Sequence, residues 1–134
     1  MLRGEMAGHA TVLVIDDAED VCVALTELLE DEGFAAKTAR DGREALDLLL
    51  GGLRPCAILL DLMMPGMNGW DFRAEQMRVP ELAEIPVAVL SASFNAQSTL
   101  AQFGDIAFFA KPAPTSAIIA FVRRHCCPPA AGSD

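Results

Sequence analysis

The chain alternates between short apolar runs and longer stretches in which apolar residues recur every three or four positions. Residues 11–16, 56–60, 86–90 and 106–110 are almost continuously apolar. Continuous apolar runs of this length are typical of strands buried on both faces of a sheet. Residues 34–39 give a weaker signal of the same kind. The pattern therefore predicts five strands.

Helical spacing separates and follows these runs. In the first such stretch Val21, Leu25, Leu28 and Leu29 fall on one face. The predicted helices cover residues 18–32, 42–50, 70–77, 94–103 and 115–124. The fourth of them has the least regular pattern and is short.

Capping residues mark several helix ends. Asp17 is expected to cap the first helix, and Gly33 to follow its last turn. Asp41 and Glu44 form an acidic variant of the capping box at the second helix. Asn68 is expected to cap the third.

The order of elements is strand then helix, five times over. This order predicts an α/β fold with a doubly wound, five-stranded parallel sheet covered by helices on both faces. A chain of 134 residues fits one domain, expected at 11–125, with flexible ends at 1–10 and 126–134. In such sheets ligands bind at the carboxyl ends of the strands.

The charge balance narrows the classes of partner. A net charge of −9, from 19 acidic and 10 basic side chains, disfavours nucleic acid and favours a cation or a basic protein surface. No apolar run approaches the roughly 18 residues of a membrane span. Residues 1–10 lack the apolar core of a signal peptide. We therefore expect a cytoplasmic protein that contacts no membrane.

The four cysteines offer no metal-binding pattern. Cys22 and Cys56 lie within apolar stretches, so we interpret them as small buried hydrophobic residues rather than ligands or disulfide partners. His125, Cys126 and Cys127 are adjacent and lack the separated spacing of a tetrahedral site.

Polar side chains follow four of the five predicted strands. The first strand ends in Asp16 and Asp17, the third is followed by Asp61, the fourth by Ser91 and the fifth by Lys111. Because the carboxyl ends of parallel strands share one edge of the sheet, these side chains are expected to converge. Taken singly, each has an ordinary explanation as a helix cap or turn residue. Their joint placement makes chance improbable.

This set of groups suits phosphoryl transfer to a carboxylate. Three carboxylates repel one another, and Mg²⁺, which prefers oxygen ligands, would relieve that repulsion. Lys111 can pair with Asp61 or with a phosphoryl oxygen, and Ser91 can donate a hydrogen bond to another. An ionised Asp61 would be the nucleophile, giving an aspartyl phosphate.

The same residues carry a family resemblance. The segments 12–17 (VLVIDD), 60–69 (LDLMMPGMNG), 89–92 (VLSA) and 108–112 (FFAKP) make the chain similar to response-regulator receiver domains. The likeness covers roughly residues 11–125, and the second segment is the most specific. It implies a flavodoxin-like (βα)5 fold with strand order 2-1-3-4-5.

The resemblance also implies a metal site and an acceptor. Asp61 would be the phosphoacceptor. Asp16, Asp17 and Asp61 would hold Mg²⁺, with the backbone carbonyl of Met63 as a further ligand. Such a protein is a switch that contributes to its own phosphorylation and dephosphorylation, rather than a turnover enzyme.

Further roles follow from the resemblance at the last two strands. Ser91 and Lys111 would bind phosphoryl oxygens, while Ser91 and Phe108 would move as the switch pair. Two features depart from the family pattern. The stretch from Ser91 to Lys111 is one or two residues short, and Ala113 replaces a bulkier apolar residue. The shorter stretch puts in doubt the surface of the fourth helix, fifth strand and fifth helix, which the family usually uses to contact its output partner.

The expected function is that of a single-domain response regulator. A histidine kinase or phosphotransfer protein would phosphorylate Asp61, and a downstream protein would read the result. Only about ten residues follow the last helix, which leads us to expect signalling by protein contact. Ile118, Ile119, Phe121 and Val122 indicate either a broad core stripe or the face of a phosphorylation-dependent homodimer.

Two other functions stay open at this point. The domain could be a receiver-like scaffold that binds partners without being phosphorylated, although a scaffold need not keep all five polar groups. It could also be a Mg²⁺-dependent phosphatase with an aspartate nucleophile. Such enzymes usually carry a second acid two residues further on, where this chain has Met63.

Overall fold

A parallel sheet of five strands forms the middle layer of the fold in a computed structural model that describes residues 11–62, 67–91, 106–111 and 113–126. Its strand order is β2-β1-β3-β4-β5, as expected from the resemblance. The strands are β1 (Thr11–Ile15), β2 (Ala35–Ala39), β3 (Ala57–Asp61), β4 (Val87–Ser91) and β5 (Ala107–Ala110). Each lies within one residue of its predicted position.

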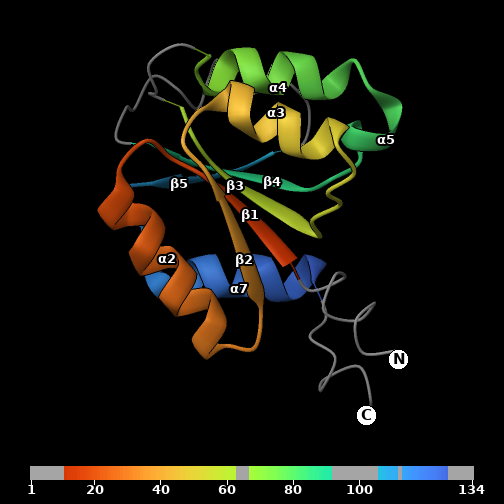
Figure 1. Cartoon of the computed structure of the whole chain (residues 1–134). Helices are drawn as coiled ribbons and strands as arrows, with labels where there is room; N and C mark the ends of the chain where they lie inside the picture. Colours follow the sequence, from red (N-terminus) through yellow and green to blue (C-terminus); the bar gives the residue numbers. More distant parts are fainter. Residues whose placement is uncertain (1–10, 63–66, 92–105, 112, 127–134) are drawn as a thin grey trace.

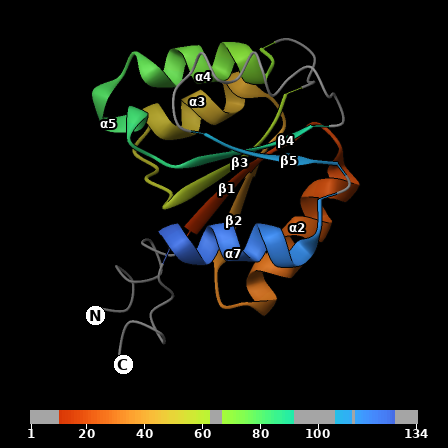
Figure 2. The same ribbon diagram turned by 180° about the vertical axis from the view of Figure 1, so that it is seen from behind.

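Helices cover both faces of the sheet (Figures 1 and 2). The described helices are α2 (Glu19–Asp31), α3 (Gly42–Leu50), α4 (Gly69–Met77), α5 (Pro80–Ala83) and α7 (Thr115–His125). In Figure 1, α3, α4 and α5 lie above the sheet, and α2 and α7 lie below it. The doubly wound arrangement is thus confirmed.

The alternation of side chains along each strand divides the core between these two faces. Leu13, Ile58 and Val89 belong to the cluster beneath α3 and α4, whereas their neighbours Leu59 and Ala88 belong to the cluster beneath α2 and α7. Both sets are buried, which is why these strands are apolar throughout rather than alternately polar.

Three of the predicted caps are confirmed. Gly33 adopts a positive φ of 93° directly after α2. Asp41 accepts a hydrogen bond from the Glu44 backbone N–H at 2.8 Å, and Glu44 reaches back to the N–H of Arg40. Asn68 caps α4 by accepting from the backbone N–H of Asp71 at 3.0 Å.

The prediction that Asp17 caps the first helix is wrong. The N-cap residue is Ala18, and its N–H donates to Oδ1 of Asp16 at 2.9 Å. Asp16 is thereby fixed to the start of α2, while Asp17 is exposed and makes no capping hydrogen bond. The pattern could not distinguish the two because both acids precede the helix.

A buried glutamine joins α4 to the short helix α5, which the sequence pattern did not predict. Gln76 is fully buried and donates to the backbone carbonyls of Leu82 at 2.8 Å and Ile85 at 3.2 Å. Its side-chain oxygen accepts from Arg73 at 2.8 Å. These bonds satisfy a polar side chain that would otherwise be costly to bury.

The apolar run on the last helix serves the core. Ile118, Ile119, Phe121 and Val122 are all buried in the cluster beneath α2 and α7. This outcome confirms the core stripe and removes the observation that had suggested a dimer face. The predicted helix at 94–103 lies outside the described residues.

The interpretation of Cys56 as an unpaired buried residue is wrong. Cys56 forms a disulfide with Cys126 across a sequence separation of 70 residues. Cys22 is buried and, among the described cysteines, is the free one. Hydrophobic periodicity shows that a cysteine is buried but not which distant residue lies beside it.

Candidate functional site

Three carboxylates meet at one edge of the sheet. Asp16 follows β1 and Asp61 ends β3, and these two strands are hydrogen-bonded neighbours. One oxygen from each of Asp16, Asp17 and Asp61 lies within 4.8 Å of the other two. Asp16 and Asp61 are buried, at 2% and 6% exposure, whereas Asp17 is exposed. The prediction that these acids converge is confirmed.

Lys111 extends from the end of β5 into this cluster. Its Nζ lies 3.2 Å from Oδ2 of Asp16 and 3.4 Å from Oδ1 of Asp61. Burial lowers the pKa of Lys111, but the two carboxylates outweigh that effect and raise the pKa above its usual value. The ammonium group therefore stays charged across the neutral range and offsets part of the negative charge at the site.

Ser91 is placed by the pairing of the last two strands. It ends β4, is almost fully buried, and lies opposite Ala110 of β5. Its backbone carbonyl accepts a hydrogen bond from the N–H of Lys111 at 2.9 Å. This bond fixes the starting point of the Lys111 side chain relative to Ser91.

Phe108 is partly buried and packs against the core cluster beneath α3 and α4. The carbonyl of Met63, expected as a further metal ligand, lies outside the described residues.

Two glycines that sequence reasoning did not single out hold the segment after Asp61. The N–H of Gly69 donates to the carbonyl of Leu62, and the N–H of Gly42 donates to the carbonyl of Met67, both at 3.0 Å. A Cβ added to Gly69 would lie 2.7 Å from the backbone oxygen of Asp61. The glycines are visible in the sequence, but the backbone they approach is not.

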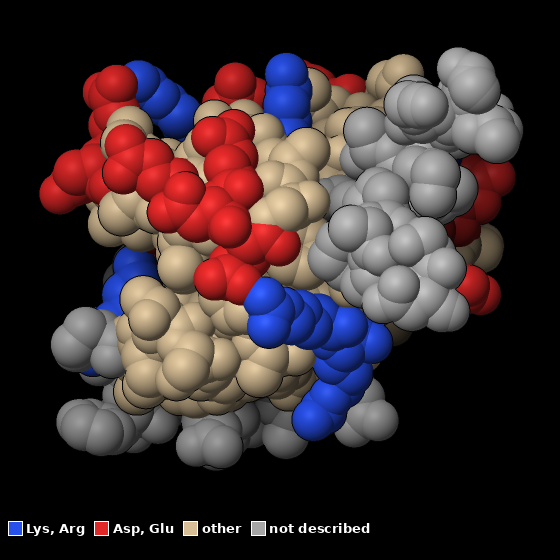
Figure 3. All heavy atoms as spheres, turned by 90° about the horizontal axis from the view of Figure 1, so that it is seen from below, with Lys and Arg blue, Asp and Glu red and all other residues tan. Residues whose placement is uncertain are grey.

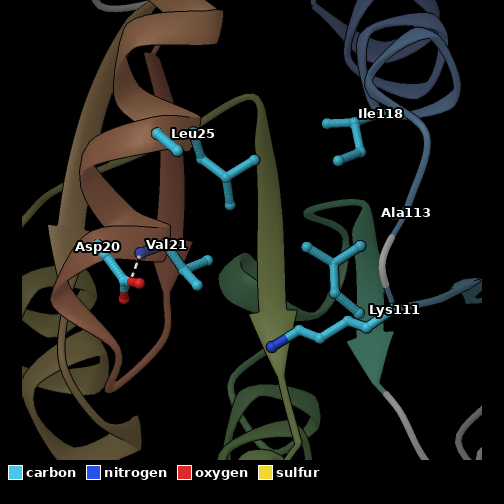
Figure 4. Close-up of a pocket in the computed structure, with 8 residues that line it drawn as sticks. Asp20, Val21, Leu25, Lys111, Ala113 and Ile118 are labelled. Atoms are coloured by element: carbon cyan, nitrogen blue, oxygen red, sulfur yellow. Dashed lines mark hydrogen bonds between the residues drawn. The ribbon is translucent and has the colours of Figure 1, made fainter.

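An apolar groove opens beside Lys111, between α2 and α7 (Figure 4). It encloses about 550 Å³. In Figure 4, the Leu25 and Ile118 side chains face this space, and Lys111 runs past its mouth toward the carboxyl end of β3. The residues lining the groove are Asp20, Val21, Ala24, Leu25, Leu90, Lys111, Ala113 and Ile118.

The surface around the groove is strongly charged. Figure 3 shows acidic side chains gathered on the face that carries α2 and α7, with basic side chains beside them. Exposed acids of α2 include Glu19, Asp20 and Glu27. Where the two helices approach each other, Arg123 forms an ion pair with Glu32.

Residues 12–123 match the family model described as the response regulator receiver domain. The chain belongs to this family. Receiver domains are the phosphoacceptor switches of two-component systems. They interact with histidine kinases or phosphotransfer proteins and bind Mg²⁺ at an acidic site.

Curated relatives of this receiver are longer proteins. It is 32% identical over 114 residues to the response regulator MprA of Mycolicibacterium vanbaalenii, covering 84% of this chain and 48% of MprA. It is 33% identical over 114 residues to the DNA-binding response regulator MtrA of Mycobacterium tuberculosis H37Rv, again covering 84% and 48%. The receiver thus spans about half the length of these relatives.

Solved structures share the receiver fold. The chemotaxis protein CheY4 of Vibrio cholerae superposes with a TM-score of 0.76 at 28% identity, covering 87% of this chain and 98% of CheY4. The signal receiver domain of a histidine kinase from Syntrophus aciditrophicus gives a TM-score of 0.78 at 27% identity, with 86% and 88% coverage. In the described part of the receiver, no helix has the length and apolar character to cross a membrane.

The carboxylate cluster fits the Mg²⁺ that receiver domains bind. Three carboxylate oxygens within reach of one another supply the hard donors that this ion prefers. The ammonium of Lys111 balances only part of their charge. The donor set therefore suits a small divalent cation better than a soft transition metal.

Proposed function

We propose that this receiver accepts a phosphoryl group on Asp61 from a histidine kinase or phosphotransfer protein and signals by protein contact. The observation that carries the proposal is the position of Lys111 Nζ, 3.4 Å from Asp61 and 3.2 Å from Asp16. This position places a fixed positive charge between the proposed acceptor carboxylate and a buried carboxylate of the proposed metal site.

Each side chain at the site has a distinct part in the proposed transfer. An oxygen of Asp61 attacks the phosphorus atom as the bond to the donor nitrogen breaks. Lys111 stabilises the charge on the phosphoryl oxygens, and the Ser91 hydroxyl donates to one of them. Asp16 and Asp17, with Asp61 and the Met63 carbonyl, would hold Mg²⁺. When bound, that ion supplies further positive charge to the transferring group.

The conformational response is proposed to pass through Ser91 and Phe108. Ser91 is almost fully buried at the end of β4, and Phe108 lies on the neighbouring strand, opposite Val89. Drawing Ser91 toward a phosphoryl group vacates space beside it. Phe108, only partly buried at present, turns into that space and shifts the population toward an active surface.

Intact-mass spectrometry after incubation with acetyl phosphate tests this function. The expected result with Mg²⁺ is a single phosphoryl adduct, which is absent when a chelator replaces the metal. An unmodified mass from folded, metal-supplied protein would instead favour the alternative of an unphosphorylated scaffold. Multiple turnover of a phosphate ester would favour the phosphatase alternative.

Replacing Lys111 with methionine is expected to separate metal binding from phosphoryl transfer. Mg²⁺ should bind more tightly, because the variant lacks the ammonium group that pairs with Asp16 and Asp61 in the wild type. Phosphoryl uptake should slow at least about 10-fold through loss of a charge-stabilising donor. Metal binding is followed by fluorescence of Trp70, the chain's one tryptophan.

Lys37→Met is the matched control for this change. Lys37 is exposed on β2, and its replacement should leave the Mg²⁺ affinity and the rate of phosphoryl uptake unchanged. Weaker Mg²⁺ binding in Lys111→Met would contradict the proposed competition between the lysine and the metal.

The groove between α2 and α7 is the proposed docking place for the phosphodonor protein, because it is apolar and adjoins Lys111. Ala113→Leu partly fills it. Transfer from a purified phosphorylated histidine kinase or phosphotransfer protein that acts on the wild type should slow, while uptake from acetyl phosphate stays unchanged. Ala120→Leu, on the exposed side of α7, is the control. Equal transfer rates for all three proteins would exclude docking at the groove.

We also propose that this receiver acts in the cytoplasm, where its phosphodonor would be found. Its net charge of −9 favours protein partners over nucleic acid. A single-domain form is a further proposal. The phosphorylation-dependent homodimer expected from the apolar run on α7 has lost that support, because the run is buried in the core. Size-exclusion chromatography with light scattering, before and after phosphorylation, tests for the dimer.

A further inference from the structure

The disulfide lies at the end of the sheet opposite the carboxylate cluster. Cys56 immediately precedes β3, and its N–H donates to the carbonyl of Thr11, the first residue of β1. Asp61 ends the same strand five residues later, about 16 Å away at the usual rise of a strand. Cys126 is the C-cap residue of α7. The disulfide therefore connects the last turn of α7 to the amino-terminal edge of the sheet.

Helix α7 reaches from this disulfide to the groove beside Lys111. Near its start, Ile118 lines the groove. At its end, Phe121 and Val122 pack in the core cluster that also includes Cys126. Near this end Arg123 also forms an ion pair with Glu32, which is partly exposed. Exposed pairs contribute little to stability, so the disulfide adds a covalent constraint to the core packing of Phe121 and Val122 at this end of α7.

We propose that Cys56 and Cys126 form a redox-controlled clamp that holds the end of α7 against the sheet. The inference rests on the proposed cytoplasmic setting, where disulfides are usually transient and serve in catalysis or redox sensing. The Cα atoms are 5.4 Å apart, within the normal range for a disulfide. The described backbone thus accommodates the bond with ordinary geometry.

A low-molecular-weight disulfide is the chemical class of oxidant. Cys56 is partly exposed and Cys126 is 2% exposed, so the Cys56 thiolate attacks first. This attack forms a mixed disulfide and releases one thiol of the oxidant. The Cys126 thiolate then attacks Sγ of Cys56 and releases the second thiol. The protein loses two protons and two electrons, and the oxidant gains both electrons as it is reduced to two thiols.

Oxidation is expected to stabilise the domain and hold the end of α7. The linkage closes a loop with a sequence separation of 70 residues, which restricts the unfolded chain strongly. The oxidised protein should melt about 10 °C above the reduced protein. Amide hydrogens in the last turn of α7 should also exchange more slowly when the clamp is closed.

The test compares the full chain after treatment with glutathione disulfide and after treatment with dithiothreitol. Peptide mapping of the alkylated, oxidised protein should identify a Cys56–Cys126 linkage that dithiothreitol removes. The difference in melting temperature should vanish in Cys56→Ser and in Cys126→Ser. It should persist in the matched control Cys127→Ser. These measurements need no phosphorylation, so a failure of the clamp is distinguishable from a failure of the proposed function.

Three results would overturn the clamp. One is a chain that glutathione disulfide leaves with all thiols free. Another is a linkage through Cys127 instead of Cys126. The third is an identical melting temperature and α7 exchange rate for the wild type under both conditions, which needs no variant to fold.

Discussion

Asp61→Asn is expected to abolish phosphoryl uptake from acetyl phosphate in the presence of Mg²⁺. The asparagine amide keeps the size and shape of the side chain but lacks the negative charge that makes the carboxylate a nucleophile. Asp16 is also buried nearby, yet one of its oxygens accepts from Ala18 and the other faces Lys111. It is therefore not expected to replace the acceptor. Intact-mass spectrometry is the measurement.

Asp47→Asn serves as the matched control for the acceptor. Asp47 is exposed on α3, away from the three clustered carboxylates, so the same chemical change there should leave the adduct intact. A melting curve for Asp61→Asn shows whether the fold is retained. An adduct of wild-type yield on folded Asp61→Asn would place the acceptor elsewhere.

Gly69→Ala is expected to lower the free energy of unfolding by about 2–3 kcal/mol, the upper part of the usual range for overpacking. The added Cβ would lie 2.7 Å from both the Asp61 backbone oxygen and the Leu62 Cα. Because these are backbone atoms, no side-chain rotation relieves the clash. The strand end that carries the acceptor must move, so phosphoryl uptake should slow as well. Chemical denaturation and intact-mass time courses measure the two effects.

Gly51→Ala is the corresponding control. Gly51 has a helical φ of −80° at the end of α3, and an added Cβ there would come no closer than 3.1 Å to its nearest neighbour. Its free energy of unfolding should change by less than about 1 kcal/mol, since the restriction of the unfolded chain by alanine opposes the tight contact with the Asp47 carbonyl oxygen. An equal free energy of unfolding for Gly69→Ala and the wild type would show that the segment after Asp61 can move without loss of stability.

Much of the fold could be predicted because its determinants are local. A strand buried on both faces must be apolar throughout, and β1, β3 and β4 met this condition clearly. Asp41 and Asn68 act within their own first turns, so sequence spacing was enough to identify these caps. The alternation of strands and helices then limited the topology.

The candidate site was predictable for a related reason. In a parallel sheet every strand ends at the same edge, so a residue following a strand has its position set by topology alone. The convergence of Asp16, Asp61 and Lys111 followed from this rule. The rule did not predict which of Asp16 and Asp17 accepts the hydrogen bond at the start of α2, because that depends on which side chain turns toward Ala18.

The sequence by itself determined the layers of this protein, the edge at which its polar groups gather and the kind of chemistry they suit. Only the tertiary structure decided that Cys56 meets Cys126, that Gly69 approaches the backbone of Asp61 and that a groove opens beside Lys111. The reason is physical. Periodicity and capping report on contacts within a few residues, whereas these features depend on the packing of segments far apart in the chain.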